Sequence, residues 1–100
     1  MPAYLIVFRE TPETDPEAKA EYTRRATGAS AGHALKPLAA YGALHPVEGA
    51  APDAVILLEF PDVAAARAWY DSPAYQAAIP LRLKSADYRS VIVEGLPARG

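Results

Sequence analysis

Two short segments of the chain are apolar at every consecutive position, and this pattern constrains the fold more than any other feature. The segments are Val55-Ile56-Leu57-Leu58 and Val91-Ile92-Val93, both containing β-branched residues. Successive side chains of a strand point to opposite faces, so a sheet with one wet face alternates between apolar and polar residues. Strands that are apolar in both registers therefore predict a sheet that must be covered on both faces.

The order of the predicted elements gives the fold class. Strand signals cover residues 3–9, 43–48, 54–60 and 88–94. Helix starts are marked by the capping residues Asp15, Asp62 and Ser72, and Pro16 and Pro73 add the proline of a first turn. This order is that of a ferredoxin-like βαββαβ subunit, an α+β fold with helices on one face of a four-stranded antiparallel sheet. We expect a single domain of this type over residues 1–100.

The end of the first helix is the least regular part of the pattern. An apolar stripe that includes Tyr22 supports a helix from Pro16 onward, but several glycines and Pro37 weaken its continuation. Two alternatives stay open, a frayed continuation toward Tyr41 or a second short helix that ends at Gly42. In both, the second strand begins only after this segment.

The second apolar face of the sheet is expected to pack on another copy of the chain. Two helices cover only one face, and a chain of 100 residues gains from association because small domains bury a limited share of their surface. The expected assembly is an isologous homodimer through the sheet face. The alternative is that the two-sided strands are a coincidence in a chain rich in alanine and valine.

Composition excludes several classes of partner and site. A formal charge of −2 and a pI near 5.6 provide no broad positive field, so we expect neither a nucleic-acid partner nor a membrane partner. Cysteine is absent, which removes disulfides, thiolate nucleophiles and cysteine-ligated metals. Met1 leads directly into a strand-like segment without a leader pattern, so we expect a cytoplasmic protein.

Five segments, taken in order, form a pattern found in a known family. They are Asp15 to Ala18 with Glu21-Tyr22, Ala39 to Gly42, Leu58 to Pro61, Arg67 to Gln76, and Val93-Glu94-Gly95. Together they resemble the family called domain of unknown function 1330 (DUF1330), within the dimeric α+β barrel superfamily. The resemblance implies a ferredoxin-like subunit whose sheet packs against that of a second subunit. It implies no single activity, because the superfamily includes cofactor-free monooxygenases, isomerases, lyases, haem-handling proteins and binding modules.

Residue types needed for metal, nucleotide or nucleophilic chemistry are missing or badly spaced. His33 and His45 are far apart in the sequence, and His45 and Glu48 would point to opposite faces of a strand. No serine lies on a G-x-S-x-G elbow, and no glycine-rich loop joins a strand to a helix in the phosphate-binding pattern. We expect no metal site and no cofactor.

Aromatic residues around the second helix are the candidates for ligand binding. Trp69, Tyr70 and Tyr75, with Ser72 beside them, would rim an apolar pocket for a small molecule. The alternative is that the rings pack in the core and that Ser72 only caps a helix.

His45, Glu59 and Arg82 are the candidates for catalysis. His45 would carry a proton at neutral pH, and Glu59 would act as acid or base if it pointed into an apolar cavity. Arg82 lies in an apolar stretch and would bind a carboxylate, either that of Glu59 or that of a ligand. The alternatives are an exposed histidine, a charge at a strand end and an arginine whose head group reaches water.

Three functions follow from these candidates. The first is a homodimeric domain that binds a small apolar or aromatic molecule in a pocket. The second is a cofactor-free enzyme in which His45 and Glu59 transfer protons and Arg82 stabilises negative charge. The third is a structural or regulatory subunit without a pocket.

Overall fold

Strands that are far apart in the sequence form one antiparallel sheet in the order β2-β3-β1-β4. The computed structural model describes residues 1–97, so the last three residues of the domain expected over 1–100 lie outside the described part. The elements are β1 (Ala3–Arg9), α1 (Pro16–Ala29), β2 (Lys36–Ala40), β3 (Ala54–Phe60), α2 (Val63–Tyr70), α3 (Pro73–Ser85) and β4 (Tyr88–Glu94). The predicted ferredoxin-like α+β class is confirmed.

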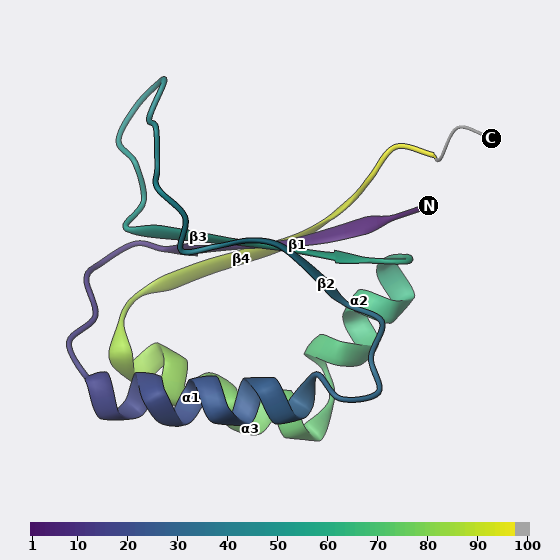
Figure 1. The fold of residues 1–100 in the computed structure, drawn as a ribbon, viewed down its shortest axis with the longest axis horizontal. Helices are drawn as coiled ribbons and strands as arrows, with labels where there is room; N and C mark the ends of the chain where they lie inside the picture. The colour runs from purple at the N-terminus through teal and green to yellow at the C-terminus, as the bar shows by residue number, and fades with distance from the viewer. Residues whose placement is uncertain (98–100) are drawn as a thin grey trace.

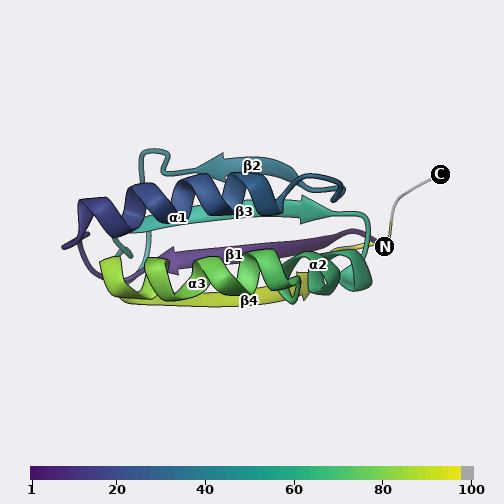
Figure 2. The same cartoon turned by 90° about the horizontal axis from the view of Figure 1, so that it is seen from below.

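All three helices lie on the same side of the sheet (Figure 1). Seen from the helix side, α1 lies in front of β2 and β3, α3 lies in front of β1 and β4, and α2 lies at one end (Figure 2). No helix of residues 1–97 combines the length and the apolar character needed to cross a membrane.

The predicted helix starts are confirmed by their capping contacts. The Asp15 carboxylate accepts the N–H of Ala18 at 3.0 Å, and the Asp62 carboxylate accepts the N–H of Ala65 at 2.7 Å. Each side chain satisfies one of the backbone donors that a first helical turn leaves free.

The face of the sheet that looks toward the helices forms the core. Along β1, Ala3, Leu5 and Val7 are buried, and the residues between them are only partly buried. This period of two assigns the buried set to the helix side of the central strand. The largest other side chains buried in this layer are Phe60, Trp69 and Tyr75.

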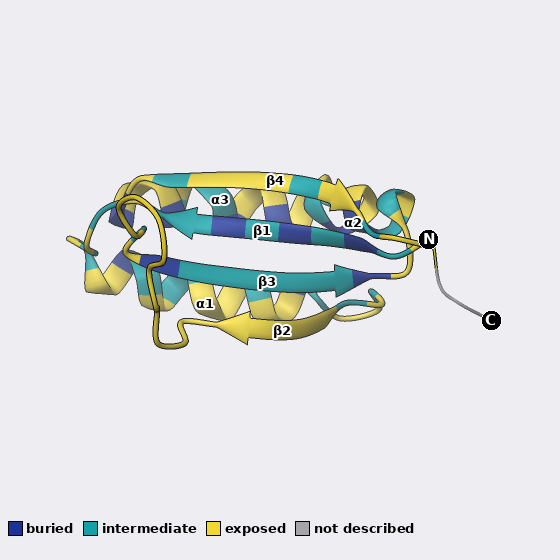
Figure 3. Cartoon of the chain, turned by 90° about the horizontal axis from the view of Figure 1, so that it is seen from above, coloured by how far each residue is buried: buried dark blue, intermediate teal, exposed yellow. Residues whose placement is uncertain are grey.

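The opposite face of the sheet is also apolar, as the two-sided strands predict. Tyr4, Ile6 and Phe8 form its middle row, and Ile6 lies in register with Leu57 of β3 and Val91 of β4. Residues in register share a face. Figure 3 looks at this face, which carries no helix, and Val91 is 50% exposed there.

The prediction of the second strand at 43–48 is wrong, and so is a helix that reaches Tyr41. Helix α1 ends at Ala29, and β2 is Lys36–Ala40. Pro37 is tolerated because β2 is an edge strand, where one side needs no ladder hydrogen bonds. The chain then leaves the sheet at Tyr41, whose φ of 58° is unusual for a residue other than glycine. Residues 41–51 are all exposed and form a loop that rises from the sheet on the side away from the helices (Figure 1).

Candidate functional site

The three residues predicted for acid–base catalysis lie in different parts of the molecule. His45 is in the exposed loop that rises away from the helices. Glu59 is opposite Tyr4 on the helix-free face of the sheet, and it lines a hollow there with Lys36. Arg82 is buried on the other side of the sheet, among the helices.

The sheet register gives a measure of this separation. The Arg82 guanidinium carbon lies 5.0 Å from the ring centroid of Tyr88, and Tyr88 is opposite Arg9. Glu59 is opposite Tyr4, and Tyr4 and Arg9 are five residues apart on β1, which is about 17 Å of strand. The structure therefore does not bring His45, Glu59 and Arg82 together.

The aromatic residues predicted for ligand binding do form one cluster. The ring centroids of Trp69 and Tyr75 are 4.0 Å apart, and those of Tyr70 and Tyr75 are 5.6 Å apart. Tyr22 of α1 joins them, with an edge-to-face contact to Tyr75 at 6.2 Å. We call these four residues the aromatic cluster. Tyr22 is not predicted as a member from the sequence, because its only signal there is its place on the apolar stripe of α1.

Ser72 has the capping role that was its alternative. Its hydroxyl donates to the carbonyl of Trp69 at 2.8 Å and accepts the N–H of Tyr75 at 3.3 Å. Ser72 thereby fixes the turn between α2 and α3, and this turn sets the angle at which Trp69 and Tyr75 meet.

Two tyrosine hydroxyls form a polar contact inside the aromatic cluster. The oxygens of Tyr22 and Tyr75 are 2.8 Å apart, and either can donate the hydrogen bond. Burial raises the pKa of both groups, because an ionised phenolate would lose its hydration in this layer. Both hydroxyls therefore stay protonated at neutral pH.

Arg82 reaches this polar contact from α3. Its Nη1 donates to the Tyr75 hydroxyl at 3.4 Å, a long hydrogen bond to a neutral group. The residue is only 4% exposed, and within residues 1–97 its Nε has no hydrogen-bond partner. The Trp69 indole N–H and the Tyr88 hydroxyl are also buried there without a partner.

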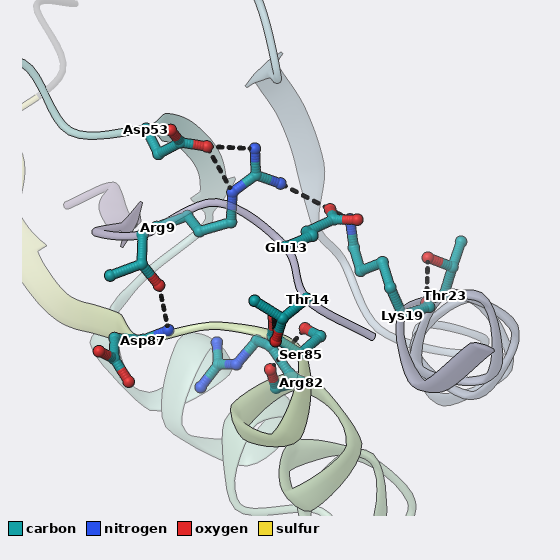
Figure 4. A network of polar contacts seen from close by, with 10 residues as sticks. Arg9, Glu13, Thr14, Lys19, Thr23, Asp53, Arg82, Ser85 and Asp87 are labelled. Atoms are coloured by element: carbon teal, nitrogen blue, oxygen red, sulfur yellow. Dashed lines mark hydrogen bonds and ion pairs between the residues drawn. The ribbon is translucent and has the colours of Figure 1, made fainter. Parts of the chain in front are cut away.

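Other partly buried cations near this end of the sheet do have counter-ions. Arg9 contacts Asp53 at 2.7 Å and Glu13 at 2.6 Å, and Lys19 contacts Glu13 at 2.9 Å. Figure 4 shows these ion pairs and shows Arg82 apart from them. Among the ion pairs of the described residues, none includes Arg82.

A groove of about 660 Å³ opens between α2 and the edge strand β4. Leu5, Ile92 and Val63 give it an apolar floor, and Tyr70 connects it to the aromatic cluster. Polar side chains stand at its rim. They are Arg67, Ser90 and Glu94. Of the lining residues only Tyr70 is predicted from the sequence, because the walls come from segments that no motif joins.

The family model for the domain of unknown function DUF1330 matches residues 2–96. The chain belongs to the DUF1330 family. This match covers both walls of the groove and the whole aromatic cluster. No curated protein matches the sequence.

Solved structures share the fold of this DUF1330 chain. A protein of unknown function from Rhodopseudomonas palustris aligns with a TM-score of 0.68 and 21% identity, over 97% of this chain and 84% of its own. A DABB family protein with a ferredoxin-like fold from Mesorhizobium loti gives 0.62 and 15%, over 97% and 100%. A dimeric ferredoxin-like protein of unknown function from Thermobifida fusca gives 0.59 and 18%, over 92% and 88%.

The DUF1330 site is suited to holding an organic molecule. Its groove offers apolar walls, the ring of Tyr70 and a few polar side chains, which is the usual composition of a small-molecule pocket, whereas Trp69 and Tyr75 are buried behind Tyr70 in the core. Within residues 1–97, no three histidine or acidic side chains gather as metal ligands would.

Proposed function

We propose that this DUF1330 chain is a homodimeric domain that binds a small apolar or aromatic molecule in the groove between α2 and β4. The observation that carries the proposal is the groove itself. Its volume of about 660 Å³ is within the range of roughly 300–1,000 Å³ that ligand pockets occupy. Its floor is apolar, and Tyr70 gives a flat ring against which an aromatic ligand packs.

The aromatic cluster supports this assignment, because it makes the groove rigid. Tyr70 rests on Tyr75, which is stacked on Trp69 and fixed by the Ser72 cap. A wall that is already ordered loses little conformational entropy when a ligand binds.

The homodimer is supported by the apolar face of the sheet. Ile6, Leu57 and Val91 form a continuous apolar row with no helix over it. An exposed apolar patch of this kind is typical of a subunit interface. The similar protein from Thermobifida fusca is described as dimeric.

The groove favours binding over the two alternatives. A cofactor-free enzyme with His45 and Glu59 as acid and base and Arg82 beside them requires all three at one substrate, whereas Glu59 and Arg82 lie on opposite sides of the sheet. A subunit without a pocket does not account for an apolar groove that ends on an ordered aromatic cluster.

The test is to fill the groove. Ser90 is an exposed residue that lines it, so Ser90→Trp would place an indole in the ligand space. We expect neutral aromatic amides, with 4-phenylbutyramide as the first probe, to bind the unmodified chain saturably in calorimetry. Ser90→Trp should weaken this binding at least about tenfold, because the indole and the ligand cannot share the space.

Ala20→Trp is the matched control, because Ala20 is exposed on α1 away from the groove. This control should bind the probes as the unmodified chain does. Equal binding by Ser90→Trp, or no saturable binding to the unmodified chain, would contradict the proposal.

A further inference from the structure

We propose that the ligand of this groove is an apolar monocarboxylate and that Arg82, together with Tyr88, binds its carboxylate. The inference rests on the proposed function, and it adds the chemical class of the ligand. It comes from a buried cation for which the described chain supplies no anion.

The surroundings of Arg82 compensate its charge only in part, through the C-terminal end of α3, a cation–π contact and one long hydrogen bond. An arginine is protonated at every physiological pH, and taking its charge out of water costs several kcal/mol. The cation–π contact with Tyr88 offsets only part of this cost. The long hydrogen bond from Nη1 to the neutral Tyr75 hydroxyl adds little. A bound anion is the compensation that this site lacks.

Neighbouring cations show that the chain does supply anions where a cation is structural. Arg9 is less buried than Arg82, yet it has two carboxylates within 2.7 Å. Arg82 is the only charged residue of the described chain that is fully buried. The difference indicates that Arg82 is kept for an anion from outside the chain.

Two hydrogen-bond donors without a partner lie close to each other here, one on Arg82 and one on Tyr88. The Nε of Arg82 and the hydroxyl of Tyr88 are both buried without a partner, and the guanidinium lies over the Tyr88 ring. A carboxylate accepts up to four hydrogen bonds, so it can use both donors. A guanidinium also matches the planar geometry of a carboxylate.

The backbone around Arg82 is fixed before any ligand binds. The Ser85 hydroxyl donates to the carbonyl of Arg82 at 2.7 Å, and the N–H of Thr14 donates to the carbonyl of Ser85 at 2.8 Å. Figure 4 shows these residues side by side at the end of α3. The guanidinium is thus carried by a rigid element, which binding sites require for precision.

The lining of the groove ends near this position, with Ser90 in it and the Nε of Arg82 and the hydroxyl of Tyr88 buried beyond it. Ser90 lines the groove, and Tyr88 lies two residues further along β4 on the same face, about 7 Å away. A ligand whose apolar body rests on Ile92 and Tyr70 can therefore direct its polar end past Ser90 toward Arg82.

The charge of the site favours a carboxylate over a phosphate. Arg82 is in the last turn of α3, where the helix dipole places partial negative charge. One guanidinium beside that end of a helix balances a single negative charge, whereas a doubly charged phosphate needs a second cation or a helix N-terminus.

The test compares two ligands of nearly the same shape, 4-phenylbutyrate and 4-phenylbutyramide, by calorimetry on the full chain. We expect the carboxylate to bind the unmodified chain at least about tenfold more tightly than the amide, because only it forms the charge-assisted pair. Arg82→Met, which keeps the length of the side chain, should abolish this preference and retain binding of the amide. Tyr88→Phe should reduce the preference several-fold.

Lys84→Met is the control for long-range electrostatics, because it removes an exposed positive charge from the same helix. It should leave the carboxylate preference unchanged.

Equal affinity of the unmodified chain for both ligands would overturn the inference and leave the proposed function standing, whereas no binding of either ligand would remove both. If Arg82→Met does not fold, Tyr88→Phe decides, and a full preference in that variant would overturn the inference. Tighter binding of 3-phenylpropyl phosphate than of 4-phenylbutyrate would also overturn it.

Discussion

Two tyrosine hydroxyls form a polar contact inside the otherwise apolar layer between the sheet and the helices. Tyr22 and Tyr75 bring their oxygens within 2.8 Å between the sheet and the helices, and Tyr75 also receives Arg82. Removing either hydroxyl leaves the other with one partner fewer in a place that water does not supply. The pair therefore links the stability of the helix layer to its state of protonation.

Tyr22→Phe tests this link through the dependence of stability on pH. Burial raises the folded-state pKa of Tyr22 above its ordinary value of 10.0. Below pH 10.0 the Tyr22 hydroxyl is protonated in both the folded and the unfolded chain. Above pH 10.0 the Tyr22 hydroxyl ionises in the unfolded chain while it stays protonated in the folded chain. The free energy of unfolding therefore falls as the pH rises. We expect Tyr22→Phe to show a shallower fall between about pH 9 and 11 in urea unfolding than the unmodified chain does. Parallel profiles would contradict this account.

Gly95 shows why one residue of the family pattern is a glycine. Its N–H donates to the carbonyl of Pro2 at 2.7 Å, which joins the two ends of the described chain. A Cβ at this position would lie 2.7 Å from the Cε2 of Tyr4 and 3.2 Å from the oxygen of Pro2. Only a residue without a Cβ allows this close approach.

Helices α2 and α3 are the elements that carry the site, and local sequence signals define both of them. Asp62 and Ser72 cap their first turns with the side-chain contacts that the sequence predicts. Such contacts depend on residues three positions apart, so no knowledge of the fold is required to predict them.

Asp62→Ala measures the contribution of one such cap. The variant removes the acceptor of the Ala65 N–H, and we expect a loss of about 1 kcal/mol in the free energy of unfolding. Asp62→Ser should retain most of the stability, because a serine hydroxyl accepts the same hydrogen bond. Chemical denaturation of the three proteins is the measurement, and equal midpoints would show that the cap contributes nothing.

Strand β2 shows what local signals cannot give. Its residues include Pro37 and two alanines, and all five are exposed. They form a strand because β3 offers a free edge, a property of the assembled sheet and not of the segment. Residues 43–48 carry strand signals in the sequence, but within residues 1–97 no strand pairs with them, so they stay in the exposed loop.

At the scale of the whole molecule, the two-sided apolar strands predict the sheet and its uncovered face correctly, whereas the site is predicted only in part. Trp69, Tyr70 and Tyr75 are near one another in the sequence, and the short turn at Ser72 brings together the two helices that carry them. The groove joins α2 to β4, and the contact between Arg82 and Tyr88 joins α3 to β4. Contacts between separate elements are fixed by tertiary packing, and no spacing in one sequence shows them.

The uncovered sheet face gives the prediction that belongs to this scale. Ile6 lies at its centre, between Leu57 and Val91. In a dimer formed through this face, Ile6→Lys would bury a charge without a partner, at a cost of several kcal/mol per subunit. In a monomer the same lysine would extend into water and leave the fold intact.

Sedimentation at micromolar concentration separates the two states, because the chain has a mass of 10.7 kDa and a dimer twice that mass. We expect the unmodified chain to sediment as a dimer and Ile6→Lys as a folded monomer with an unchanged far-UV circular dichroism spectrum. Ala20→Lys places the same charge on the exposed side of α1 and should remain dimeric. A dimer that persists in Ile6→Lys would mean that the copies meet elsewhere. A monomeric unmodified chain would mean that this apolar face is stable in water, in which case the sheet would need no second copy.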